Sequence, residues 1–158
     1  MGTLLALIFF CAFVVLPVWT VFRKRDLKQQ VLQAAGLADG QGYTFFYGQS
    51  GIALNPLTRT VVVASKWRVK HYPFSDIRSW AASKVDAGQP HMTAFGGVSG
   101  ALQNTGNAML AKAKADAASG FFVTVKDIDD PKWHVQMIKE RDQARWMEIF
   151  RQEINEKP

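Results

Sequence analysis

Residues 43–74 read YTFFYGQSGIALNPLTRTVVVASKWRVKHYPF and contain the clearest secondary-structure pattern in the chain. Short segments rich in β-branched and aromatic residues alternate here with segments rich in Gly, Asn and Pro, and this alternation is typical of strands joined by tight turns. Turns at residues 48–51 and 55–58 would make neighbouring strands antiparallel. The pattern predicts four consecutive strands, at residues 43–47, 51–54, 60–64 and 68–74.

Downstream of these strands the sequence predicts three further strands and a closing helix. Residues 75–80 continue as a turn into a strand, and Asp129-Asp130-Pro131 joins two more, at 121–128 and 132–137, into a hairpin. A helix is predicted from about Lys139 to Asn155, because apolar residues recur there at three- and four-residue spacing. They are Ala144, Met147, Phe150 and Ile154, with Trp146 and Ile149 widening the same sector.

A Gly- and Ala-rich segment at about residues 94–120 interrupts the strand pattern. Its second half has the composition of a helix, although Gly100 and Gly106 weaken the start of such a helix. Small side chains bury little apolar area. We therefore expect an insertion that lies either against the sheet or away from it.

Charge and cysteine content narrow the class of protein. The chain has 158 residues and a formal net charge of +6. Half of that excess lies in residues 23–28, where four basic residues accompany Asp26. Membrane topology and attraction to anionic headgroups explain such a cluster, so the net charge does not predict nucleic-acid binding. Cys11 is the only cysteine, which excludes a disulfide within the chain and a multi-cysteine metal site. About 130 residues follow the apolar N-terminus, enough for one domain with its own core.

The first 22 residues contain no charged side chain, and basic residues follow them directly. A helix of this length spans roughly 30 Å, the thickness of the hydrocarbon core of a bilayer. We therefore predict a transmembrane anchor at residues 1–22, then a basic juxtamembrane helix and linker at 23–42. A cleaved signal peptide is the alternative, disfavoured because no basic residue precedes the apolar run. Basic residues stay on the cytoplasmic side, which places the N-terminus outside and the folded part in the cytoplasm. The flanking basic residues are Arg23, Lys24, Arg25 and Lys28.

Several short motifs together carry a resemblance to known proteins. They are GIALN (51–55), YPFSDIRSW (72–80), FVTVKD (122–127), PKW (131–133) and WMEI (146–149). With antiparallel strands and a C-terminal helix, they resemble the pleckstrin-homology-like fold of bacterial membrane-associated proteins. The whole chain also resembles an uncharacterised family of small bacterial single-pass membrane proteins with a cytoplasmic domain of unknown function.

The resemblance implies an α+β fold class and a location. The expected fold is an N-terminal transmembrane helix followed, over residues 43–158, by a pleckstrin-homology-like antiparallel β-barrel or sandwich with a C-terminal amphipathic helix. The expected location is the bacterial inner membrane. The Gly- and Ala-rich insertion departs from the simple form of this fold.

Basic residues around an indole form the main candidate site, and they are Arg59, Lys66, Trp67, Arg68 and Lys70. By the two-residue period of a strand, Lys66, Arg68 and Lys70 would share one face. Ammonium and guanidinium groups beside an indole suit anionic lipid headgroups at a membrane surface. A solvated strand face without a ligand is the alternative, and it is favoured over lipid binding.

Other motifs do not predict a catalytic, metal or cofactor site. The three histidines, His71, His91 and His134, are not spaced to meet on one helix. The acidic residues within 127–130 lack the ligand pattern of a calcium loop, so we expect a solvated hairpin there. The glycines within 96–100 lack the Lys and Ser or Thr of a phosphate-binding loop. Trp80, Trp133 and Trp146 are expected to pack in the core or at its rim.

These observations predict a non-catalytic, membrane-tethered protein-interaction module at the cytoplasmic face. The insertion at 94–120 is the expected place of contact with a protein partner or a second copy of the chain. Two alternatives stay open. One is recognition of anionic lipid headgroups by the basic hairpin, and the other is a small enzyme, which would need His71, Asp76 or His134 to converge in one cleft. No cofactor, metal or nucleic-acid partner is expected.

Overall fold

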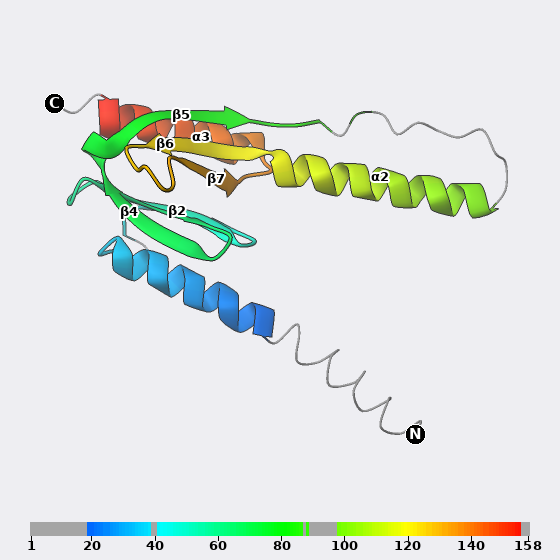
Figure 1. Cartoon of the computed structure of the whole chain (residues 1–158), viewed down its shortest axis with the longest axis horizontal. Helices are drawn as coiled ribbons and strands as arrows, with labels where there is room; N and C mark the ends of the chain where they lie inside the picture. Colours follow the sequence, from blue (N-terminus) through cyan, green and yellow to red (C-terminus); the bar gives the residue numbers. More distant parts are fainter. Residues whose placement is uncertain (1–18, 39–40, 87, 89–97, 156–158) are drawn as a thin grey trace, which may run out of the picture.

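The structure, a computed structural model, describes residues 19–38, 41–86, 88 and 98–155, with side chains described from residue 108 onward in the last range. In these residues the strands form two antiparallel sheets that lie against each other, flanked by three α-helices (Figure 1). The first sheet has the order β1-β2-β3-β4. Its strands are β1 (Tyr43–Tyr47), β2 (Ser50–Asn55), β3 (Thr60–Ser65) and β4 (Arg68–Pro73). The four strands predicted within residues 43–74 are therefore confirmed.

The second sheet has the order β5-β6-β7 and follows a short connection from the first. A 3-10 turn, η1 (Phe74–Asp76), leads into β5 (Ile77–Ser83), and the other two strands are β6 (Gly120–Val125) and β7 (Lys132–Gln136). The register between β5 and β6 shifts between Ile77 and Ser79, which marks a β-bulge. The hairpin predicted at residues 129–131 does connect β6 and β7.

The C-terminal helix α3 (Glu140–Phe150), continued by a π-helical turn η2 (Arg151–Asn155), packs against β5 and β6. Its buried side chains are Gln143, Trp146, Ile149 and Phe150, whereas Ala144 is exposed. The predicted helix is confirmed, but its buried stripe is rotated relative to the predicted one. Gln143 explains the rotation, since its side-chain amide donates to the carbonyls of Met137 (2.6 Å) and Ser83 (3.2 Å), at the ends of β7 and β5.

The main hydrophobic core lies between the two sheets and α3. Its largest fully buried side chains include Phe121 and Phe150, whose rings meet edge to face at 5.0 Å. Trp133 and Trp146 are buried in the same core, and Trp80 contacts the Phe150 ring at its rim, as predicted for these aromatic residues.

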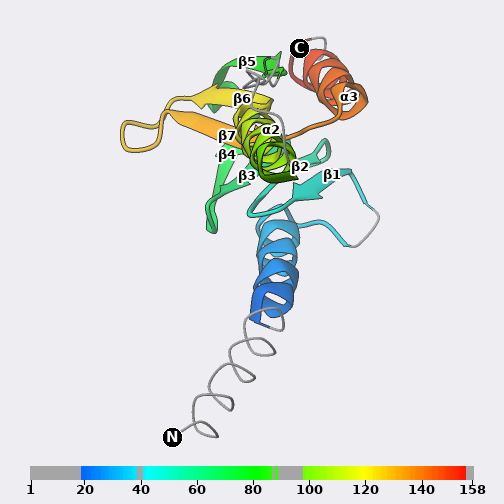
Figure 2. The same cartoon turned by 90° about the vertical axis from the view of Figure 1, so that its right-hand side faces the viewer.

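A second core lies on the outer face of the first sheet, under an N-terminal helix described over residues 19–34. Leu27, Val31 and Ala35 pack there against β2 and β3, on the side of the sheets away from α3 (Figure 2). The helix ends at Gly36, whose φ of +62° places it in the left-handed region, and the Leu37 amide donates to the Leu32 carbonyl across this end. The segment expected to be a juxtamembrane helix and linker is therefore packed against the domain over residues 27–35.

The expected fold class needs correction. None of the helices in the described residues is both long and apolar enough to cross a membrane. The described chain is an α+β structure of two antiparallel sheets and three α-helices, and the expectation of a transmembrane helix followed by a pleckstrin-homology-like barrel or sandwich is wrong in that form. The described N-terminal helix, residues 19–34, shares only residues 19–22 with the predicted anchor, and the rest of it carries several charged residues and one apolar face that packs on a sheet. Residues 1–18 of the predicted anchor lie outside the described residues.

The Gly- and Ala-rich insertion contains one long helix, α2 (Val98–Ala118), which extends away from the two sheets (Figure 1). Its C-terminal end is held by Ser119, which is 1% exposed. The Ser119 hydroxyl donates to the Ala115 carbonyl (2.8 Å) and accepts the Val85 amide (2.9 Å). Residues 94–97 of the predicted insertion lie outside the described residues.

We expect Leu27→Ala to lower the free energy of unfolding of the full chain by about 2–5 kcal/mol, because it opens a cavity between the N-terminal helix and the sheet. Urea unfolding followed by tryptophan fluorescence measures the change. Gln29→Ala, at an exposed position of the same helix, is the matched control and should stay within about 0.5 kcal/mol of the wild type. Equal stability of the two variants would show that this helix is not part of the cooperative unit.

Candidate functional site

The turn between β3 and β4 has an unusual backbone. Its two central residues, Lys66 and Trp67, have φ values of +51° and +67°, and the flanking Ser65 and Arg68 are paired in the sheet. A two-residue hairpin turn of this kind favours Asn-Gly, because most residues other than Gly and Asn are strained when their backbone adopts a positive φ. The chain places a lysine and a tryptophan there instead, and the two side chains lie in different surroundings.

The five predicted headgroup-binding residues do not gather on one surface. Trp67 packs with the second core beside the N-terminal helix. Arg59 lies in the turn at the opposite end of β3, with its guanidinium 5.6 Å from the centre of the Phe74 ring. Arg68 and Lys70 extend from β4 toward the β6–β7 loop. Lys66 alone lies at the mouth of a polar cleft.

Arg68 and Lys70 form an ion-pair cluster with Asp127 and Asp130 of the β6–β7 loop. The Lys70 ammonium lies 2.8 Å from a carboxylate oxygen of Asp127 and 2.7 Å from one of Asp130, and Arg68 pairs with Asp130. Both carboxylates are largely buried, with 17% and 15% of their side-chain surfaces exposed. The acidic loop, expected to be a solvated hairpin, instead neutralises two of the five predicted basic site residues.

The ion-pair cluster is connected to the core through Tyr72. Its hydroxyl donates to Asp127 Oδ2 (2.7 Å) and accepts from the indole N–H of Trp133 (3.1 Å). Asp127 Oδ1 also accepts the backbone amides of Asp129 (3.0 Å) and Asp130 (3.2 Å), which holds the loop in an Asx turn. The two sheets are therefore joined here by a chain of hydrogen bonds as well as by apolar packing.

These contacts shift the ionisation of the groups involved. The hydrogen bond from Lys70, followed by that from Tyr72, holds the pKa of Asp127 well below its usual range. The same ammonium lowers the pKa of Asp130, and the two carboxylates raise the pKa of Lys70. Burial, together with the hydrogen bond to Asp127, raises the pKa of Tyr72 to about 12. All four groups therefore keep their ordinary neutral-pH charge states, which suits a structural link.

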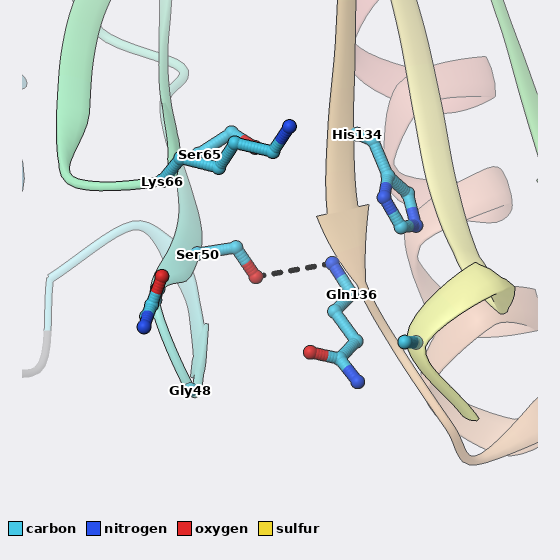
Figure 3. Close-up of a pocket in the computed structure, with 8 residues that line it drawn as sticks. Gly48, Ser50, Ser65, Lys66, His134 and Gln136 are labelled. Atoms are coloured by element: carbon cyan, nitrogen blue, oxygen red, sulfur yellow. Dashed lines mark hydrogen bonds between the residues drawn. The ribbon is translucent and has the colours of Figure 1, made fainter. Parts of the chain in front are cut away.

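A cleft of about 350 Å³ lies beside this cluster, between the two sheets (Figure 3). It is lined from the β1–β2 turn, the β3–β4 turn, β7 and the end of α2. Figure 3 shows Ser65 and Lys66 extending from one side toward His134 and Gln136 on the other. The lining residues are Gly48, Gln49, Ser50, Ser65, Lys66, Ala117, His134 and Gln136.

Hydrogen bonds fix the floor of the cleft. The Ser50 hydroxyl donates to the Tyr47 carbonyl and accepts the Gln136 backbone amide, each at 3.0 Å, so it joins the edge of β7 to the first sheet. The Gln136 side-chain amide donates to the Asp116 carbonyl of α2 (3.0 Å). The cleft is therefore part of the folded structure and does not depend on loose surface side chains.

The residues proposed for a small enzyme site lie in different places. His134 lines the cleft, whereas His71 is exposed on β4, opposite Val62 and on the other face from Lys70. Asp76 lies in η1, at the start of β5. Within the described residues, no three His, Cys, Asp or Glu side chains are grouped so that they could hold a metal ion. His91 lies outside these residues.

Sequence reasoning missed the carboxylates that pair with the basic strand and the polar residues of the cleft. The two-residue alternation did place Arg68 and Lys70 on a common strand face, and Asp127 and Asp130 were predicted to lie in a loop. No local signal connects the two, because they are about sixty residues apart in the chain and meet only when the sheets pack.

The fold and this geometry define an α+β domain with a polar cleft between two antiparallel sheets, a class that does not by itself specify an activity. Residues 42–157 match the family described as a Domain of unknown function (DUF4755), and the chain belongs to this family. No curated protein and no solved structure matches the chain.

Asp127→Asn should make the free energy of unfolding less dependent on pH in the acid range. The carboxyl of Asp127 has a lower pKa in the folded chain than in the unfolded chain, where it is about 3.9, so its stabilising contribution is complete above about pH 5 and declines as the pH falls below that. The variant should be less stable than the wild type at neutral pH, and the difference should narrow in acid. Urea unfolding across this pH range measures it.

The matched control for this measurement is Asp86→Asn, whose side chain is 89% exposed. It should change neither the stability nor its pH dependence noticeably. A difference between Asp127→Asn and wild type that stayed constant from neutral pH into acid would contradict the assigned role of the carboxylate charge.

Proposed function

We propose that this chain is a non-catalytic protein-interaction module in which α2 packs against a helix of a protein partner. The observation that carries the proposal is the exposure of neighbouring apolar side chains on a helix that leaves the body of the domain. Met109 and Leu110 are 70% and 62% exposed, while Ala115, close to the sheets, is 6% exposed. Large apolar side chains exposed together favour an interaction surface.

The length and composition of α2 support a helical partner. A helix of 21 residues is about 31 Å long, and helices in proteins depend mostly on packing for their stability. Alanine makes up six of the eleven residues between 108 and 118, and small side chains allow the axes of two helices to approach closely. The helix is anchored at one end through Ser119 and Asp116, so the rest of its length is available for such packing.

The other predicted functions have less support from the described contacts. Headgroup recognition by the five basic and aromatic residues together would need them on one surface, whereas Arg68 and Lys70 are paired with carboxylates and Trp67 packs beside the N-terminal helix. Bacterial origin and a location at the cytoplasmic face of a membrane stay predictions from the sequence. The proposed interaction through α2 does not depend on either.

We expect a photoreactive benzoylphenylalanine in place of Met109 to give a discrete cross-linked species in cells that express the full chain. Contact with a partner helix would place the reactive group against protein, and mass spectrometry of the product identifies what it contacts. A product of twice the mass of the chain identifies a second copy, and any other discrete mass identifies a different protein.

The matched control is the same substitution at Ile128, which is 99% exposed in the β6–β7 loop. Its cross-linking should be weak and diffuse. Leu110→Glu is a second test of the cross-linked product formed from position 109. The substitution keeps a good helix former but places a charge in the contact, so it should abolish that product. No discrete product, or the same product from positions 109 and 128, would overturn the proposal.

A further inference from the structure

We infer that the cleft between the β3–β4 turn and β7 binds a small phosphate-bearing anion, with Lys66 and His134 as its principal contacts. None of the eight residues that line the cleft is acidic. The Lys66 ammonium and the His134 ring approach the cleft from opposite sides, and Ser65 lies beside the lysine (Figure 3). Ammonium, imidazole N–H and hydroxyl groups are the donors that bind phosphate oxygens in proteins.

The backbone of the β3–β4 turn provides an independent observation. Lys66 and Trp67 are two of three non-glycine residues with positive φ in the described chain, the third being Arg59. Each such residue costs of order 1 kcal/mol, and strain of this kind clusters at functional sites. The strained turn directs Lys66 to the cleft while Trp67 packs beside the N-terminal helix. Asn-Gly would form this turn without the strain but would supply no positive charge.

His134 is held in a fixed orientation across the cleft. Its ring stacks on that of Phe122, with centroids 4.6 Å apart and planes 11° from parallel, and Nε2 lies 3.3 Å from the Ser119 carbonyl. A side chain at Gly120 would put its Cβ 2.4 Å from the same nitrogen, so the glycine is what lets the ring lie there. The Ser119 carbonyl can only accept, so Nε2 carries a proton, and the ring donates to an anion through Nδ1 when it is protonated as the imidazolium. The contacts with Phe122 and Ser119 hold the ring without further ordering.

The charges around the cleft favour an anion. An adjoining pocket of about 270 Å³ shares Ser65, Lys66 and His134 with the cleft and adds Arg68, Lys132, Trp133 and Asp130. Asp130 is the acidic group of this pocket, and it is already paired with Arg68 and Lys70. Among the residues that the structure describes, Lys66 and Lys132 have no carboxylate within salt-bridge distance. The excess positive charge therefore remains available to a ligand.

The size of the cleft fits a compact molecule. Its 350 Å³ lies near the lower end of the range for small-molecule sites. A phosphate group with a short organic substituent has this size, and it can come either from a free molecule or from a lipid headgroup. Inorganic phosphate and glycerol phosphate probe the first source, and vesicles of phosphatidylglycerol, compared with vesicles of phosphatidylcholine, probe the second.

The test is a titration of the isotopically labelled full chain, followed by the NMR signals of the Gln136 amide and the His134 ring. The key variant is Lys66→Asn, because Asn tolerates positive φ and the variant should fold at least as stably as the wild type. His134→Phe is the second variant, since it keeps the ring stack on Phe122 and removes the ring nitrogens. Lys114→Gln, at an exposed position of α2, is the control with the same change in charge.

We expect saturable shifts with glycerol phosphate or phosphatidylglycerol for the wild type and for Lys114→Gln, and affinity at least about tenfold weaker for Lys66→Asn and His134→Phe. Shifts with the soluble phosphates alone would identify a free molecule, and a preference for phosphatidylglycerol vesicles alone would identify a headgroup. Absence of saturable binding to every probe, or equal binding by Lys66→Asn and the wild type, would overturn the inference. Neither outcome depends on the proposed contact of α2, so the two proposals can fail separately.

Discussion

The strands β2 and β3 are buried on both faces, and this burial holds the layers of the domain together. Ile52, Leu54, Val61 and Val63 face the second sheet and α3, while Ala53, Val62 and Ala64 face the N-terminal helix. A strand in this position has no face exposed to solvent, so the side chains between its ends are apolar. Both faces of β2 and β3 are covered only when the second sheet and the N-terminal helix are in place, so the folded unit includes residues well upstream of β1.

Polar contacts complete the layers that this burial brings together. Asn55, which is 3% exposed at the end of β2, donates to the Ala35 carbonyl (2.8 Å) and accepts the backbone amides of Leu57 (3.0 Å) and Thr58 (3.3 Å). One side chain thus connects the end of the N-terminal helix with the β2–β3 turn. The ion-pair cluster does the same between β4 and the β6–β7 loop. Buried polar groups of this kind must be satisfied, and among the described residues no buried side-chain polar atom lacks a partner.

The two surfaces with proposed functions consist of side chains that these internal contacts do not use. Most basic groups of β4 are paired internally, and Lys66, one residue before that strand, is directed to the cleft by a strained turn. The helix α2 is held at one end by Ser119 and carries exposed Met109 and Leu110. Ser119 also contacts His134 through its carbonyl, so the anchor of the proposed protein contact and the wall of the proposed anion site meet at one residue. A partner on α2 and an anion in the cleft would therefore act on neighbouring parts of the fold.

Local patterns in the sequence determined the strands, their turns and the C-terminal helix, because two-residue and three-to-four-residue periodicities report which side chains must be buried. The end of the N-terminal helix at Gly36 was equally local, since a glycine at positive φ suffices to end it. Which basic residues form ion pairs was set by the packing of the two sheets. The strand pattern placed Arg68 and Lys70 on one face but could not supply Asp127 and Asp130, which come from a distant loop. The tertiary structure also decided that residues 27–35 cover a sheet, because an apolar helix face does not specify the surface that it will bury.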